Sequence, residues 1–129
     1  MKPQLFIRTV EAFFPKPLFH AVYLRLFRPR HAAELFRVVD GNRFFLRRWL
    51  PWVDGVRIAE DSAQFVERSI QQYRRAQALN IGIWRHRQII GVVSFHTFDW
   101  KTGSTSMGYW LAASQNGQGI ISAASRSMI

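Results

Sequence analysis

Three β-rich runs separated by very short gaps constrain the fold more than any other feature of this sequence. The runs are rich in β-branched and aromatic residues and lie at residues 81–85, 88–100 and 106–112. Only His86 and Arg87 separate the first two runs, and two residues is the commonest loop length of a β-hairpin. The next gap, at residues 101–103, is also of hairpin length, and Gly103 can adopt the positive φ that such a loop often needs. The sequence therefore predicts a meander of three strands.

Before the meander, the sequence predicts one strand followed by helices. Residues 21–27 are rich in β-formers, and Pro29 then suits the entry to a helix. The first helix has apolar residues at the i, i+3, i+4 and i+7 positions of one face, namely Ala32, Leu35, Phe36 and Val39. We expect that helix to end at Gly41. A second short helix is expected to stop before Pro51, and a third is expected to cover residues 60–78.

The first 19 residues show no clean hydrophobic period. They are interpreted as an N-terminal extension or as a mistaken upstream start. The overall order of strand, helices, strands and a last helix indicates an α+β fold.

A glycine-bearing loop at residues 115–120 (QNGQGI) lies between the third strand of the meander and a helix expected at residues 120–129. Glycines let the backbone approach a ligand closely, and a helix N-terminus offers unpaired N–H groups and a positive dipole end. Such a site suits a pyrophosphate. The loop lacks the Gly-Lys-Ser/Thr ending of a nucleoside-triphosphate loop and the three glycines of a dinucleotide fingerprint. By itself the motif is also compatible with an ordinary strand–helix turn.

The chain carries a formal net charge of +10, and most of its basic residues are arginines. A basic field of this size attracts polyanions such as nucleic acid, ribosomes or a phosphorylated cofactor. An ordinary solvated surface explains the same charge equally well, so composition leaves both interpretations open.

Composition also excludes several classes of site. The 129 residues contain no cysteine, which excludes disulfides, thiolate metal sites and a Cys nucleophile among them. No apolar run approaches the roughly 20 residues that cross a bilayer, and the first residues lack the pattern of a secretory signal. His20, His31 and His86 are scattered without metal-ligand spacing, so we expect no metal site. We therefore expect a cytoplasmic protein with no membrane partner.

Taken together, five short segments resemble the GNAT acetyltransferases, and within them the ribosomal-protein (Rim-type) branch. The segments occur in the family's order and at similar spacing: Trp49-Leu50-Pro51-Trp52, Glu60-Asp61, Ser94-Phe95-His96, Gly108-Tyr109-Trp110-Leu111 and Asn116-Gly117-Gln118-Gly119-Ile120. The resemblance covers about residues 20–129. It implies the N-terminal part of a GNAT fold, which is a mixed, mostly antiparallel sheet with helices packed on it, preceded by the extension at residues 1–19.

The resemblance also implies roles for particular residues in binding acetyl-CoA and an amine. Six residues would bind the pyrophosphate, namely Asn116, Gly117, Gln118, Gly119, Ile120 and Ile121. The last four of them would do so through their backbone amides. Backbone groups of Trp110, Leu111 and Ala112 would pair with the pantetheine arm, as an added strand would. Tyr109, which is also a candidate catalytic residue, and Trp110 would flank the thioester. Trp49 and Trp52 resemble the family's substrate-side aromatics. Ordinary core or sheet packing is the alternative for each of these aromatic side chains.

Three departures from the family pattern stand out. Asn116 occupies a position where the family usually has Gln or Arg. Ile58 occupies the helix-capping position, where a missing Ser or Thr costs about 1 kcal/mol. The sequence stops at Ile129, inside the helix after the loop, so we expect a C-terminally truncated domain. The family's next strand, last helix and final hairpin would follow, together with the tyrosine that often protonates the CoA thiolate.

Without cysteine, transfer is expected to proceed by direct attack of an amine on acetyl-CoA in a ternary complex. A protein α-amine has an unperturbed pKa near 7.7–8.0, so roughly a fifth is neutral near pH 7.2, whereas less than about 0.1% of a lysine is neutral. An N-terminal acceptor therefore needs only a weak base. His96 lies on the strand next to the cofactor strand and is the candidate for a base acting through water. A satisfied core or surface histidine is the alternative.

The expected function is therefore transfer of an acetyl group from acetyl-CoA to an amine. The expected acceptor is the N-terminal amine of a ribosomal or other protein, and a small amine is the alternative. Ribosome association is a further expectation. Two alternatives belong to other classes. One is a truncated, catalytically inactive remnant, and the other is a basic RNA- or ribosome-binding module that uses the aromatic and basic residues at 43–52.

Overall fold

The computed structural model describes residues 3–99 and 101–128. The helices and strands, in chain order, are α1 (Pro3–Phe13), β1 (Lys16–Phe19), β2 (Val22–Leu26), α2 (Ala32–Gly41), α3 (Arg43–Leu46), α4 (Ala59–Arg74), β3 (Leu79–Arg85), β4 (Gln88–Asp99), β5 (Ser104–Leu111) and α5 (Ile120–Met128). Three short 3-10 turns complete the order, namely η1 (Pro29–His31), η2 (Pro51–Gly55) and η3 (Ala113–Gln115). The strand, helix, meander and last helix predicted from the sequence are confirmed.

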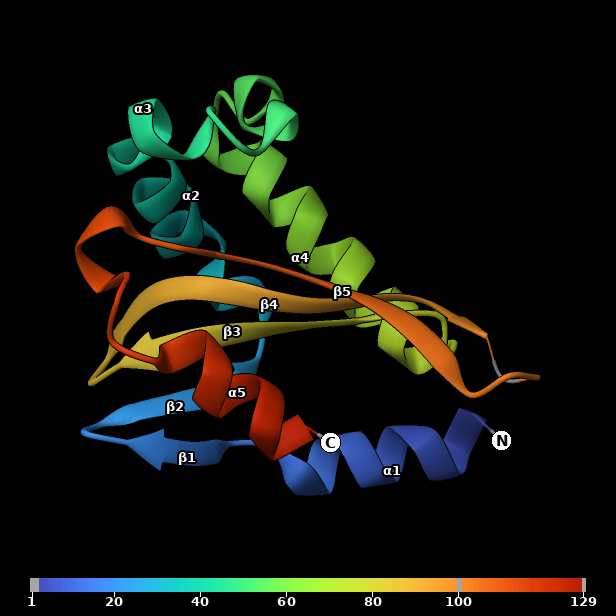
Figure 1. Cartoon of the computed structure of the whole chain (residues 1–129). Coiled ribbons are helices and arrows are strands. Elements are labelled where there is room, and N and C mark those ends of the chain that lie inside the picture. The colour runs from blue at the N-terminus through green and yellow to red at the C-terminus, as the bar shows by residue number, and fades with distance from the viewer. Residues whose placement is uncertain (1–2, 100, 129) are drawn as a thin grey trace.

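The strands form one antiparallel sheet in the order β1-β2-β3-β4-β5, so each strand pairs with its neighbours in sequence (Figure 1). The predicted hairpins are present. His86 takes a φ of 55° in the first and Gly103 takes a φ of 70° in the second. Because β5 is last in the order, only one of its edges pairs with a strand among the described residues.

Helices cover both faces of the sheet, and each face has its own hydrophobic core (Figure 1). On one face, α2 and α4 contribute Leu35, Val39 and Val66, which pack with Trp84 and Trp110 from the strands. On the other face lie α1 and α5, whose buried residues Phe6, Val10, Ile120 and Ala124 pack on Ile81, Ile83 and Val93. Successive side chains of a strand point to opposite faces, so β3 and β4 supply both cores.

The first 19 residues, in which we expected no clean period, contain α1 and β1. Phe6, Val10 and Phe14 follow a spacing of four along the chain and are all buried in the core on the α5 face. The hydroxyl of Tyr73 on α4 also donates to Glu11 at 3.1 Å. This segment therefore packs on the rest of the chain. The domain boundary at residue 20 stays a prediction.

The predicted helix boundaries shift at two places for local reasons. The helix expected over residues 60–78 ends at Arg74, because the chain turns at Ala76, where φ is 54°, and then enters β3.

At the start of α4, the Ile58 side chain cannot cap the helix, and Asp61 performs this role instead. Its Oδ2 accepts the backbone N–H groups of Arg57 at 2.8 Å and Ile58 at 3.1 Å, and these bonds lower the pKa of the Asp61 carboxyl.

The segment before η2 is less helical than the sequence suggested. The second short helix expected before Pro51 is present only as α3, followed by turns and by η2.

None of the helices in the described part of the chain is long and apolar enough to span a bilayer.

His31, at the end of η1, is a buried histidine with a structural role. Its ring packs edge-on against Trp84, and its Nδ1 accepts the backbone N–H of Arg28 at 2.9 Å. Burial lowers the pKa of His31 to about 4, and the charges of Arg25, Arg30 and Arg28 add to this effect.

We predict that the stability of the fold falls as the pH drops from about 6.5 to about 4. The pKa of His31 in the folded chain lies below its unfolded value, so in this window the unfolded chain binds the extra proton. The loss near pH 5 should be about 1–2 kcal/mol, because one pKa unit corresponds to roughly 1.4 kcal/mol. Chemical denaturation near pH 7 and pH 5 measures it. His31→Asn keeps an acceptor for Arg28 but does not titrate, so an equally steep pH dependence in this variant would contradict the assignment.

Candidate functional site

The loop between β5 and α5 has a conformation that depends on its glycines. We call residues 113–119 the glycine loop. Gly117 has a φ of 80° and Gly119 has a φ of 73°, a region that other residues rarely adopt. A Cβ at either position would meet no atom within 4 Å, so both glycines are required by backbone conformation and not by crowding.

The start of α5 presents main-chain N–H groups that nothing in the described chain uses. The first bond of the helix runs from the N–H of Ala123 to the carbonyl of Gly119 at 3.0 Å. Among the described residues, the amides of Gln118, Gly119, Ile120 and Ile121 have no hydrogen-bond partner. The first amides of a helix are unpaired in this way and carry its positive dipole end, so the arrangement can receive an anion.

The polar side chains of the glycine loop turn back onto the chain. Nδ2 of Asn116 donates to the carbonyl of Ala112 at 3.3 Å, and Nε2 of Gln118 donates to the carbonyl of Ser114 at 3.3 Å. At the start of the loop, the N–H of Ala113 donates to Oδ1 of Asn42, which follows α2. These bonds occupy the side chains and leave the amides near α5 as the donors that the loop offers.

The last residues of β5 differ in how much of their backbone is available. The N–H of Ala112 donates to Ile90 at 2.8 Å, and its carbonyl accepts the N–H of Gln115 at 2.9 Å. Main-chain groups alternate in direction along a strand, so those of Leu111 face the unpaired edge of β5 and those of Trp110 face β4. The pairing with pantetheine that we expected of Trp110, Leu111 and Ala112 is therefore geometrically open to Leu111, but not to Ala112, whose two groups are already bonded.

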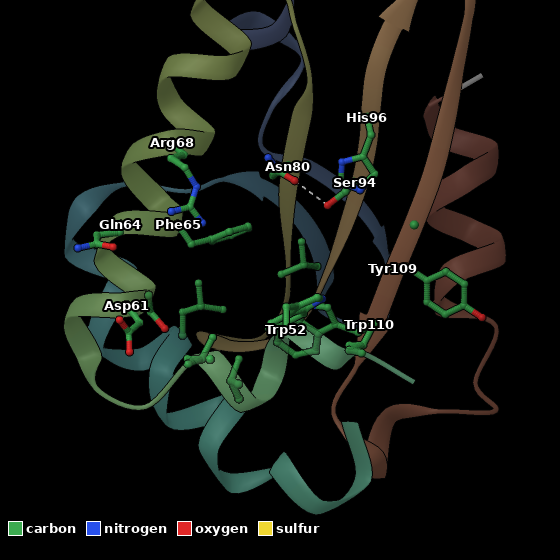
Figure 2. Close-up of a pocket in the computed structure, with 18 residues that line it drawn as sticks. Trp52, Asp61, Gln64, Phe65, Arg68, Asn80, Ser94, His96, Tyr109 and Trp110 are labelled. Atoms are coloured by element: carbon green, nitrogen blue, oxygen red, sulfur yellow. Dashed lines mark hydrogen bonds between the residues drawn. The ribbon is translucent and has the colours of Figure 1, made fainter. Parts of the chain in front are cut away.

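A cavity of about 630 Å³ lies on the opposite face of the sheet, between the helices and the strands (Figure 2). Its helical wall comes from α2, η2 and α4 and includes Leu35, Trp52 and Phe65. Its sheet wall comes from β3, β4 and β5. The end of β5 thus separates this cavity from the face on which α5 packs.

The sheet wall of the cavity carries a buried polar pair. The hydroxyl of Ser94 on β4 donates to Oδ1 of Asn80 on β3 at 2.7 Å, shown as the dashed line in Figure 2. Nδ2 of Asn80 donates in turn to Gln72 at 3.0 Å. Because the Ser94 proton is committed to Asn80, the remaining lone pairs of its oxygen can accept a hydrogen bond from a ligand in the cavity.

The structure brings some of the predicted site side chains together and leaves others apart. Trp52 and Trp110 both line the cavity, with ring centroids 6.4 Å apart. His96 and Tyr109 also line it, but the ring of Tyr109 points away from the other labelled side chains in Figure 2. Trp49 is 73% exposed and is not part of the cavity wall.

Sequence reasoning missed three polar residues of this region. Asn80 and Ser94 are polar positions inside buried strands, and that contrast is the signal that could have identified them. Arg68 lines the cavity from α4. The described residues contain no group of three or more His, Cys, Asp or Glu side chains that could hold a metal ion.

Comparison with known proteins agrees with this geometry. A family model described as an acetyltransferase (GNAT) domain matches residues 21–129. The chain is 31% identical over 99 residues to the ribosomal-protein-serine acetyltransferase of Escherichia coli strain K12, a match that covers 77% of this chain and 55% of that protein.

Two solved structures show the same fold. One is the microcin C7 self-immunity acetyltransferase MccE in complex with acetyl-CoA and AMP, with a TM-score of 0.83 and 28% identity over 87% of this chain and 62% of that one. The other is RimL, a ribosomal α-N-protein acetyltransferase, in complex with coenzyme A, with a TM-score of 0.82 and 28% identity over 87% of this chain and 63% of that one. The predicted fold class is confirmed.

The chain spans between about half and two thirds of the length of these relatives. The family match covers most of the chain and includes the glycine loop, the end of β5 and the cavity. It shows that the chain belongs to the GNAT family of acetyltransferases.

Proposed function

We propose that this chain provides the acetyl-CoA site and part of the acceptor site for transfer of an acetyl group to an amine. The observation that carries the proposal is the set of amides from Gln118 to Ile121, which have no partner among the described residues and lie beside the unpaired edge of β5. Two similar structures, one in complex with acetyl-CoA and AMP and the other with coenzyme A, support it.

The residues present fit the chemistry of acetyl-CoA. Its pyrophosphate is an anion, and the start of α5 offers several converging N–H donors and a positive dipole end. Its pantetheine arm contains amide groups, which can pair with the free main-chain groups of Leu111 as a strand would. The basic net charge of +10 favours approach of a cofactor that carries three phosphates.

The end of β5 lies between the glycine loop and the cavity. The acetyl donor, acetyl-CoA, and the acceptor amine would therefore bind on either side of it. Leu111 packs in the core under α5, whereas Trp110 belongs to the core on the cavity side. An acceptor in the cavity can therefore reach a thioester held along the free edge of β5. Trp52, Trp110 and the Ser94 hydroxyl are the side chains that would contact it.

The acceptor that we propose is the N-terminal amine of a ribosomal protein. The E. coli relative is named for a ribosomal protein and serine, and RimL is named as an α-N-protein acetyltransferase. Near neutral pH about a fifth of an unperturbed α-amine is already neutral, so this class of acceptor needs only weak base assistance. A small amine is the alternative acceptor, and ribosome association and a cytoplasmic location stay predictions.

In the proposed reaction the neutral amine attacks the thioester carbon directly, since these 129 residues hold no cysteine to take the acetyl group. A C–N bond forms, the C–S bond breaks, the nitrogen loses a proton and the thiolate gains one. His96 at the cavity is the residue that we propose to receive the amine proton through water. A backbone N–H at the free edge of β5 would stabilise the negative charge on the carbonyl oxygen. Tyr109 also lines the cavity, but its ring points away from the other labelled side chains, so it is the weaker candidate for a catalytic role.

We predict that Gly119→Glu abolishes stabilisation of the chain by acetyl-CoA. A side chain at a φ of 73° strains the loop, and its carboxylate repels the phosphates. Thermal unfolding with and without saturating acetyl-CoA measures the effect. Gly103→Glu is the matched control, because Gly103 also has a positive φ, of 70°, and open space around its Cβ, but lies in the β4–β5 turn. Equal shifts in Gly119→Glu and Gly103→Glu would contradict the loop assignment.

We predict a mass gain of one acetyl group on a peptide with a free N-terminus when it is incubated with the chain and acetyl-CoA. The same peptide with a blocked N-terminus and an internal lysine should stay unmodified near neutral pH, because its amine is almost entirely protonated. Mass spectrometry distinguishes the two. A thermal shift without any mass gain would instead support the inactive, CoA-binding remnant.

We predict that Ser94→Ala raises the KM for the acceptor about five- to tenfold, which corresponds to the loss of one hydrogen bond. Its Kd for acetyl-CoA should be unchanged, since Ser94 lies on the cavity face. Steady-state kinetics and calorimetry separate the two quantities, and Ser104→Ala, at the exposed start of β5, is the control. A larger effect on Kd than on KM would show that the cavity is not the acceptor site.

A further inference from the structure

Arg85, the last residue of β3, joins the sheet to the glycine loop. Its Nε donates to Oε1 of Gln115 at 3.0 Å, and its Nη2 donates to Oε1 of Gln118 at 2.6 Å. These glutamines are 30 and 33 positions away in sequence and lie on either side of Gly117. One planar guanidinium, which is suited to bonding two acceptors at once, thus spans the turn of the loop.

We propose that Arg85 is a positioning residue, which holds the glycine loop in the conformation that presents its amides to the phosphates of acetyl-CoA. This inference rests on the proposed function for its ligand, but the contacts that carry it exist in the chain alone. Figure 1 shows the end of β3 beside the segment that leads into α5.

The two glutamines pass the restraint on to the rest of the loop. Nε2 of Gln118 donates to the carbonyl of Ser114, and Nε2 of Gln115 donates to the Ser114 hydroxyl, each at 3.3 Å. The bonds from Arg85 therefore close a network that ties both ends of the turn to a residue of the sheet. Hydrogen bonds from a charged donor are stronger than those between neutral groups, so the two bonds from the guanidinium are the strongest in this network.

A restraint of this kind matters because of the two glycines in the loop. Glycine has more backbone freedom than any other residue, so a loop with Gly117 and Gly119 loses much conformational entropy when it is ordered by a ligand. A loop that is already ordered avoids this loss at the moment of binding. Arg85 would thus raise affinity for the cofactor without necessarily contacting it.

Among the described residues, the charge of Arg85 also has no acidic partner. The two ion pairs formed among the described residues are Arg43–Asp40 and Arg47–Asp54, and neither involves it. A positive charge beside the loop favours an anionic ligand. Lysine has the same charge as arginine but lacks the planar guanidinium that can bond two acceptors. Arg85→Lys therefore distinguishes an effect of charge from an effect of the two bridging bonds.

Arg87 provides a matched control within the same hairpin. It lies two positions after Arg85, is exposed, and makes no hydrogen bond or ion pair with the glycine loop among the described residues. Arg87→Met removes the same charge near the same place and leaves both loop glutamines bonded.

The first test uses the chain without any ligand. In Arg85→Met and Arg85→Lys, the heteronuclear NOE of the amides at residues 115–119 should fall, whereas Arg87→Met should match the unchanged chain. Far-UV circular dichroism verifies that each variant is folded. If Arg85→Met leaves these amides as rigid as in the unchanged chain, the inference is wrong, whatever the chain binds.

The second test measures the Kd for acetyl-CoA by calorimetry. Arg85→Met and Arg85→Lys should each raise it about tenfold, as expected for a charged hydrogen bond, and Arg87→Met should change it less than about twofold. The increase should be the same for 3′-dephospho-CoA. If Arg85→Lys retains full affinity, charge and not bridging is responsible. If the increase disappears with 3′-dephospho-CoA, Arg85 contacts the 3′-phosphate directly. Either result overturns the inference.

The outcomes also separate this inference from the proposed function. If the unchanged chain does not bind acetyl-CoA, the proposed function fails and the NOE experiment still decides the positioning role. If it binds and the Arg85 and Arg87 variants bind equally well, the positioning role alone fails.

Discussion

The arrangement of the site depends on main-chain N–H groups at the start of α5 that no other described residue uses. They are unpaired because the first amides of a helix have no partner within it, and Gly117 and Gly119, which take positive φ values, turn the backbone from β5 into this helix. Only main-chain donors and a helix dipole are needed to hold a pyrophosphate in such a place. The side chains of the loop are occupied with holding it in shape, so the binding surface is made mostly of backbone.

The rest of the fold places this loop beside an open strand edge and a cavity. Two cores, one on each face of the sheet, fix β4 and β5 between the α2–α4 layer and α5. The end of β5 thereby belongs to both layers, with Trp110 on the cavity side and Leu111 on the side of α5. A small shift of this strand would move the loop and the cavity together. At Gly91 a Cβ would lie 2.3 Å from the Trp110 carbonyl oxygen, which shows how closely β4 and β5 pack there.

The parts of the structure that follow from local rules could be predicted from the sequence. The hairpins follow from gap lengths, and the loop conformation follows from glycines between a strand and a helix. The contacts that complete the site could not be predicted, because their partners are far apart in sequence. Arg85 reaches Gln118 across 33 positions, and Asn80 meets Ser94 only through the pairing of β3 and β4. The packing of residues 3–19 was missed for the same reason, since the partners of Phe6 are on distant elements.

An amide-resolved NMR titration of the 15.1 kDa chain with CoA would show whether the amides at residues 118–121 bind its phosphates. We expect these amides to show the largest downfield shifts, as new hydrogen bonds form, and the shifts to saturate together. If CoA binds but these four amides do not shift while others do, the pyrophosphate lies elsewhere and the proposed cofactor site is wrong.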